Sequence, residues 1–139
     1  MTGIIIVTHG PLAEAFIASA KLIIGDVENI KAIGFFQGQT VDMLKEKIMA
    51  AISELNSGDG VLIFTDIFGG SPNNMTAVSL NELGNPKNIK CFVGVNLNIL
   101  LEAIIKRDSC SFEELVKHIS DISKSSIFEL SEKLPGCSK

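Results

Sequence analysis

Residues 3–12 read GIIIVTHGPL, and this stretch decides which class of fold the chain can adopt. Its first half, residues 3–7, is a continuous apolar run of the kind found in a strand that is covered on both faces. Pro11 then opens a segment in which apolar residues recur at helical spacing up to Ile24, and Gly25 follows as a helix stop. A buried strand that leads directly into a helix indicates an α/β protein with a parallel sheet.

The same alternation continues along the rest of the chain. Short apolar runs predict three further strands, at residues 30–36, 61–64 and 89–95. Periodic segments predict four further helices, at residues 41–55, 72–83, 97–107 and 111–124. Thr40 is placed to cap one of them, and Ser111 with Glu114 matches a capping box. We therefore predict an α/β fold with an open, mainly parallel four-stranded sheet and helices on both faces.

No repeat, low-complexity tract or linker divides the chain. We expect a single domain over residues 1–139, with its core within residues 3–125. The tail, residues 126–139, is ambiguous, because Ile127 and Phe128 suit either a prolonged helix or a short edge strand.

The overall composition and charge disfavour several classes of protein. Hydrophobic residues make up 46% of the chain, which is typical of a globular protein rather than a disordered one. The formal net charge is −4 and no block of Lys and Arg occurs, which disfavours nucleic acid and anionic membranes as partners. The N-terminal apolar run is too short for a signal peptide, and no run approaches the roughly 18 apolar residues of a membrane span. We therefore expect a soluble cytoplasmic protein.

Three widely spaced cysteines, Cys91, Cys110 and Cys137, form no pair typical of a disulfide framework. The two histidines, His9 and His118, do not complete a metal-ligand pattern with them. We therefore predict reduced thiols that fill the interior, no bound metal and no cofactor. His118 is expected on the solvent face of its helix.

Polar and glycine residues gather directly after the predicted strands, where the functional site of an open α/β sheet lies. Thr8 and His9 follow the first strand, and residues 65–74, TDIFGGSPNN, follow the third. Each of these two segments places a side chain that can take up or release a proton, His9 or Asp66, close to the start of a predicted helix. We expect His9 and Asp66 to meet at one site.

The segment after the third strand, residues 65–74, is also typical of an anion-binding loop. The first turn of a helix has free N–H groups and the positive end of the helix dipole. Ser71 is placed to be the N-cap and Pro72 the first helical residue. The two preceding glycines let the backbone approach a ligand closely. We predict a phosphate-sized anion site formed by four residues of this loop: Gly69, Gly70, Ser71 and Asn73.

A histidine, a carboxylate and an anion site together suit a histidine that carries a phosphoryl group. Neutral imidazole has one nitrogen lone pair for attack on phosphorus. Asp66, bonded to the Nδ1–H of His9, would fix the tautomer, leave Nε2 as the nucleophile and stabilise positive charge on the ring. Phosphoryl transfer then needs mainly positioning and hydrogen-bond donors, which the loop can supply.

The expected rim of this site consists of five further residues: Thr8, Gly10, Gln37, Phe68 and Asn96. For Gln37 and Asn96, a second interpretation stays open. Gln37 also suits an exposed loop after the second strand. Asn96 suits the cap of helix 97–107 somewhat better than a place facing the site.

Three motifs match a known family. IIIVTHGPLAEAF, VLIFTDIFGGSPNN and FVGVNLNIL closely resemble, in this order, the enzyme IIA domain of the mannose family of the bacterial phosphoenolpyruvate:sugar phosphotransferase system. The similarity covers roughly residues 3–125. It implies that the phosphocarrier protein HPr phosphorylates His9, and that the group passes to a histidine of a IIB component. A membrane IIC/IID complex then imports and phosphorylates the sugar.

The resemblance also assigns residues and assembly. The family's orienting aspartate corresponds to Asp66 and its phosphate-contacting serine to Ser71. Family members are homodimers that exchange a C-terminal strand, which would be a fifth, antiparallel strand here. The chain departs from the family at Phe68, where many relatives have Trp, and at Asn98, where many have Pro. We expect no fused IIB domain, and therefore expect IIB on a separate chain.

Other functions stay open at this point. A regulatory module that is phosphorylated on His9 and acts by binding would use the same chemistry. The phosphotransferase subunit of dihydroxyacetone kinase is built on this fold, but its loop after the third strand lacks the GGSP pattern found here. A nucleotide-binding α/β protein is disfavoured, because neither GxGxxG nor GxxxxGK[ST] occurs.

Overall fold

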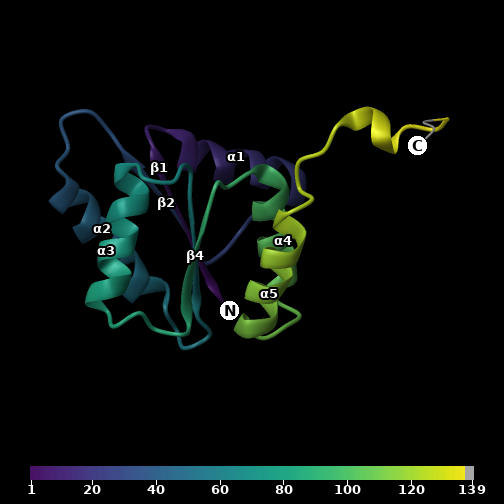
Figure 1. Ribbon diagram of the computed structural model, residues 1–139. Coiled ribbons are helices and arrows are strands. Elements are labelled where there is room, and N and C mark those ends of the chain that lie inside the picture. Colours follow the sequence, from purple (N-terminus) through teal and green to yellow (C-terminus); the bar gives the residue numbers. More distant parts are fainter. Residues whose placement is uncertain (137–139) are drawn as a thin grey trace.

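The computed structural model describes residues 1–136 and contains one parallel sheet (Figure 1). Its strands are β1 (Gly3–His9), β2 (Ile30–Phe35), β3 (Val61–Thr65) and β4 (Ile89–Val93). Their order across the sheet is β2-β1-β3-β4. The direction in which strands are added reverses between β1 and β3, so the carboxyl ends of these central strands flank the switch point of the sheet. The predicted four-stranded parallel sheet is confirmed.

β1 is two residues longer than its apolar run. Thr8 and His9 continue the ladder with β2, opposite Gly34 and Phe35. Backbone pairing, rather than hydrophobicity, therefore sets the end of this strand. As a consequence, His9 is the last residue of a central strand and not a residue of the following turn.

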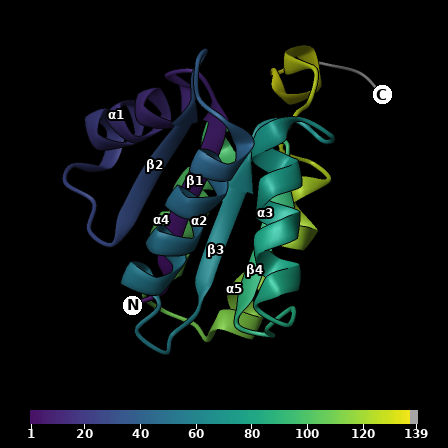
Figure 2. The same ribbon diagram turned by 90° about the vertical axis from the view of Figure 1, so that its left-hand side faces the viewer.

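Five helices cover the two faces of the sheet: α1 (Leu12–Ile24), α2 (Val41–Leu55), α3 (Ser71–Glu82), α4 (Leu97–Lys106) and α5 (Phe112–Ser123). α1, α4 and α5 pack on one face, and α2 and α3 pack on the other. Figure 2 shows α2 and α3 in front of the sheet. No described helix is long and apolar enough to cross a membrane.

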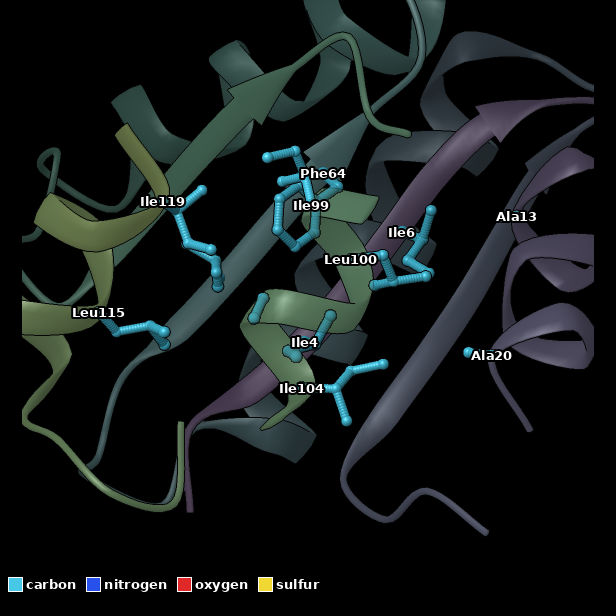
Figure 3. Packing of buried hydrophobic residues seen from close by; sticks show 12 residues of the cluster. Ile4, Ile6, Ala13, Ala20, Phe64, Ile99, Leu100, Ile104, Leu115 and Ile119 are labelled. Atoms are coloured by element: carbon cyan, nitrogen blue, oxygen red, sulfur yellow. The ribbon is translucent and has the colours of Figure 1, made fainter. Parts of the chain in front are cut away.

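The central strands are apolar throughout because both of their faces are buried. Ile4 and Phe64 point into the cluster under α1, α4 and α5 (Figure 3), whereas Ile5 and Ile63 point into the cluster under α2 and α3. All four side chains are fully buried. Each contributes about 1.5–3 kcal/mol relative to an exposed position. This double burial holds the carboxyl ends of β1 and β3 rigidly side by side.

Helix starts were predicted with mixed success. Thr40 caps α2 by accepting from the N–H of Met43, and the capping box of Ser111 and Glu114 is present at α5. Ser71, predicted as an N-cap, is instead the first helical residue of α3. The N-cap is Gly70, because its extended backbone (φ −77°, ψ 168°) lets its carbonyl accept from the N–H of Asn74.

Pro11 was predicted as a first helical residue, but it is the N-cap of α1. Proline offers no side-chain acceptor, so the cap bond comes from elsewhere. The hydroxyl of Thr8 accepts from the backbone N–H of Ala13 at 2.8 Å. This bond closes the turn that leaves His9 at the surface.

As far as the structure describes it, to residue 136, the tail forms neither of the two predicted elements. α5 ends at Ser123, and a short 3₁₀ helix, Leu130–Lys133, follows it. No fifth strand occurs within residues 1–136, and the tail projects away from the sheet in Figure 1. Strand exchange concerns a second copy of the chain and stays a prediction. Cys137 lies outside the described residues.

Candidate functional site

His9 and Asp66 meet at the carboxyl edge of the sheet. Val7 of β1 lies opposite Thr65 of β3, so the next residues of both strands emerge side by side. Nδ1 of His9 lies 2.8 Å from Oδ2 of Asp66. The backbone N–H of His9 donates to the same oxygen at 2.9 Å. One carboxylate oxygen thus holds both the ring and the backbone of the histidine.

The environment of Asp66 keeps its carboxyl group ionised. Its side chain is only 10% exposed, and this burial raises its pKa. Hydrogen bonds from the backbone and ring of His9, and from the N–H of Ile67 at 2.9 Å, outweigh that effect, so the pKa of Asp66 lies below its ordinary value. An ionised carboxylate only accepts hydrogen bonds. Nδ1 of a neutral His9 must therefore carry the proton, which leaves the lone pair on Nε2.

Gly70 lies against the Cε1–Nε2 edge of the His9 ring. A Cβ atom on Gly70 would lie 2.6 Å from Cε1 and 3.2 Å from Nε2 of His9. The first of these distances is too short for real atoms, so only glycine fits beside the ring in this position. The glycine therefore brings the backbone of the β3–α3 loop directly to the Nε2 edge of the histidine.

This loop presents free backbone donors near Nε2. Within residues 1–136, no acceptor takes the N–H groups of Gly70, Ser71 and Asn73. Such unpaired donors are normal at a helix start, where the helix dipole also favours negative charge. Of the predicted anion-binding residues, Gly70 lies beside His9, and Ser71 follows it as the first residue of α3. Gly69 precedes them in a left-handed conformation, with φ +85°.

The predicted rim residues divide into two groups. Phe68 lies at the surface with 86% of its area exposed, and Gln37 is also exposed. Gly10 turns the chain from β1 into α1 with φ +55°, and its N–H donates to the carbonyl of Phe35 at 2.8 Å. Thr8, in contrast, is fully buried and does not reach the surface of the site.

Asn96 takes the capping role that the sequence favoured. Its side-chain oxygen accepts from the N–H of Ile99 at 2.9 Å at the start of α4. Its amide nitrogen donates to the hydroxyl of Ser126 at 3.0 Å. Both polar atoms are thus used by α4 and the tail, and neither is directed to His9.

The remaining candidate groups lie outside this site. His118 pairs with Glu102 across α4 and α5, at 3.1 Å, and is half-buried. Cys91 and Cys110 are free thiols, and burial raises the pKa of Cys91 to about 11. The described part of the chain contains no cluster of three or more metal-binding side chains.

One residue of the site was missed by sequence reasoning. The side-chain amide of Asn74 donates to the carbonyl of Gly69 at 3.0 Å. Asn74 is the last residue of the quoted segment TDIFGGSPNN and stands in the first turn of α3, but in the sequence its polar side chain looks like that of any exposed helix residue. Only the fold of the loop shows that it reaches back across five positions.

The chain is similar in sequence to known proteins of one family. The chain matches the EIIA-man family model, described as "PTS system fructose IIA component", over residues 3–120. It is 33% identical over 134 residues to a fructose-specific EIIA component of the phosphotransferase system from Bacillus subtilis, covering 96% of this chain and 90% of that protein. It is 35% identical over 114 residues to the mannose-specific EIIAB component of Escherichia coli, covering 81% of this chain and 34% of that longer protein.

A solved structure shows the same fold. The crystal structure of a phosphotransferase system component EIIA from Streptococcus agalactiae superposes with a TM-score of 0.83 at 27% identity, covering 95% of this chain and 99% of that one. The resemblance inferred from the three motifs is therefore confirmed. The chain belongs to the EIIA-man family, the mannose-family IIA components of the sugar phosphotransferase system.

Proposed function

We propose that His9 is the residue that carries the phosphoryl group. As a member of its family, the chain is a phosphoryl carrier of a sugar phosphotransferase system. The observation that carries our assignment is the 2.8 Å contact between Nδ1 of His9 and Oδ2 of Asp66. This contact commits Nδ1 to donation and leaves Nε2 free beside the unpaired N–H groups of the β3–α3 loop.

In the proposed reaction, Nε2 of His9 attacks the phosphorus atom of a phosphohistidine on HPr. A new N–P bond forms, the N–P bond in HPr breaks, and its electron pair returns to the imidazole of HPr. The proton on Nδ1 stays in the hydrogen bond to Asp66, whose charge stabilises the positive charge on the phosphorylated ring. The same steps, with His9 as the leaving group, pass the phosphoryl group to a histidine of a IIB component.

The open position of the site supports a protein as the donor and the acceptor. The side chain of His9 is 46% exposed at the edge of the sheet. Ile67 and Phe68 are exposed next to it, at 58% and 86%, and offer apolar area for a partner surface. The membrane IIC/IID complex would then depend on this protein only indirectly, through IIB. We place the protein in the cytoplasm, together with HPr.

We also propose that the protein is a homodimer that exchanges its C-terminal segment. Within residues 1–136, β4 pairs only with β3, so its outer edge is open for a further strand. Ile127, Phe128 and Leu130 are exposed in the single chain, at 83%, 50% and 65%. A second copy would give both the open edge and these apolar side chains a partner.

A labelling experiment tests the assignment of His9. Phosphoenolpyruvate, enzyme I and HPr should label the wild-type protein with a phosphate that is labile in acid and stable in base. His9→Ala should abolish labelling. His118→Ala, which removes the other histidine of the chain, is the matched control and should label fully. Labelling that survives His9→Ala would contradict the proposal.

A chase separates a carrier from a regulatory module. Addition of an unphosphorylated IIB component should remove the label from phosphorylated His9 and transfer it to IIB. A module that acts only by binding would keep its label in the presence of IIB.

A further inference from the structure

Asn74 holds two successive carbonyl groups of the loop that touches His9. Its side-chain amide donates to the carbonyl of Gly69 at 3.0 Å. Its backbone N–H donates to the carbonyl of Gly70 at 2.8 Å. The side chain of Asn73 donates to the amide oxygen of Asn74 at 3.2 Å, and this bond turns the amide nitrogen of Asn74 toward the glycine.

These bonds determine where the neighbouring N–H groups point. In a trans peptide the C=O and N–H groups lie on opposite sides. The peptide that contains the Gly69 carbonyl also contains the N–H of Gly70, and the peptide that contains the Gly70 carbonyl also contains the N–H of Ser71. With both carbonyls directed at Asn74, both N–H groups are directed out of the helix start, where Gly70 lies against Cε1 and Nε2 of His9.

We propose that Asn74 is a positioning residue that directs the N–H groups of Gly70 and Ser71 at the phosphoryl group on Nε2 of His9. The inference rests on the proposed role of His9. It assigns to Asn74 no contact with the phosphoryl group itself, because its polar atoms are used by Gly69 and Asn73.

The side chain of Asn74 holds the backbone at Gly69 in place, and no packing contact on the open side of Gly69 would do so in its absence. Gly69 has φ +85°, and a Cβ atom at this position would meet no atom within 4 Å, so no neighbour packs against that side of the residue. The Asn74 side chain makes the one hydrogen bond that the described structure shows on the Gly69 carbonyl. The helix itself keeps its first bond without this side chain, because the bond to Gly70 comes from the backbone of Asn74. Loss of the amide should therefore loosen the loop while α3 remains intact.

Two substitutions separate positioning from helix stability. Asn74→Ala removes the donor. Asn74→Asp keeps the size, cannot donate when ionised, and adds a negative charge to the first turn of α3, where the helix dipole stabilises it. A structural role would make the Asp variant the better of the two, whereas a role in directing donors at a phosphoryl group makes it the worse.

The test measures the initial rate of His9 phosphorylation by phospho-HPr together with the Tm of each variant. We expect the maximal rate to fall about tenfold or more in Asn74→Ala and further in Asn74→Asp. We expect the Tm of Asn74→Asp to equal or exceed that of Asn74→Ala. Asn81→Ala is the matched control and should keep the wild-type rate, because Asn81 lies on the same helix two turns away and its side chain makes no hydrogen bond to another described residue.

Three outcomes overturn the proposal. Wild-type rates in both Asn74 variants would show that the side chain does not position the donors. Rate losses that follow the Tm, with Asp faster than Ala, would assign Asn74 to helix stability. Loss of the Nδ1 proton signal of His9 in NMR spectra of the Ala variant would place the effect on the contact with Asp66. Failure of the wild-type protein to label on His9 is a different result, because it rejects the proposed function itself.

Discussion

At the scale of single residues, the carboxylate of Asp66 organises the site before any partner arrives. Oδ2 accepts from the backbone and the ring of His9, and Oδ1 accepts from the N–H of Ile67. Hydrogen bonds to an ionised acceptor are roughly twice as strong as neutral ones. The ring therefore has its tautomer and orientation before phosphoryl transfer begins, and little reorganisation is needed during the reaction.

Asp66→Asn should slow phosphorylation of His9 by about a hundredfold or more, because an amide no longer imposes the Nδ1–H tautomer. The substitution keeps the size of the side chain, so the fold should persist. The rate of labelling by phospho-HPr measures the effect. Asp121→Asn makes the same chemical change at an exposed position of α5 and serves as the control. A wild-type rate in Asp66→Asn would refute the role given to Asp66.

The same variant has a predictable pH dependence. Because the folded-state pKa of Asp66 is lowered, its ionised form stabilises the fold at pH values above its unfolded pKa of about 3.9. This stabilisation is lost as the pH falls through the folded-state pKa. The free energy of unfolding of wild type should exceed that of Asp66→Asn at pH 7, and the difference should shrink toward pH 3. Urea denaturation at both pH values measures it, and a constant difference would contradict the assignment.

At the scale of elements, the connection from β1 to α1 determines how His9 is presented. β1 keeps pairing with β2 up to His9, and the chain then turns at Gly10 with a positive φ. Thr8 is buried beneath this turn, and its hydroxyl reaches the N–H of Ala13 in the first turn of α1. A strand end and a helix start are thus joined by one side chain, with the histidine held between them.

Thr8→Val should destabilise the protein by about 1–3 kcal/mol, because the substitution keeps the shape but leaves the buried N–H of Ala13 without an acceptor. Thr40→Val removes a similar bond at the exposed start of α2, where water can replace it, and should cost less. Chemical denaturation compares the two variants. An equal loss of unfolding free energy in the two variants would show that burial of the Thr8 hydrogen bond does not contribute to stability.

At the scale of the whole molecule, the described residues of the single chain leave the outer edges of β2 and β4 unpaired and several apolar side chains of the tail exposed. β2 and β4 are the edge strands. The tail after α5 exposes apolar side chains and makes polar contacts with the body near Asn96 and Asn98. We expect a chain with open sheet edges and exposed apolar side chains to associate with a second copy, which would cover them.

Removal of residues 126–139 should therefore convert a homodimer into a monomer while the sheet and helices remain folded. Sedimentation equilibrium measures the mass, and circular dichroism reports the secondary structure. Leu22→Ser changes an apolar residue that is 90% exposed on α1, outside the tail, and should leave the mass unchanged. A monomeric full-length chain would rule out the proposed exchange.

The sequence alone predicted most of the fold because the central strands are buried on both faces. Continuous apolar runs such as residues 61–64 can then be told apart from the helices by length and period. Strand ends were predicted less well. β1 extends to His9 although Thr8 is polar, because the strand end follows the hydrogen-bonded ladder with β2. A linear pattern of hydrophobicity does not contain that pairing.

The sequence by itself determined the α/β sheet, the two loops of the site and the pairing of a histidine with a carboxylate, because parallel strands place their carboxyl ends at one edge. Only the tertiary structure decided that Gly70, not Ser71, caps α3, that Thr8 is buried, and that Asn74 holds the loop. These details depend on distances of a few ångströms between groups on either side of a turn. Such distances follow from the packing of the helices against the sheet, and no pattern along the chain contains them.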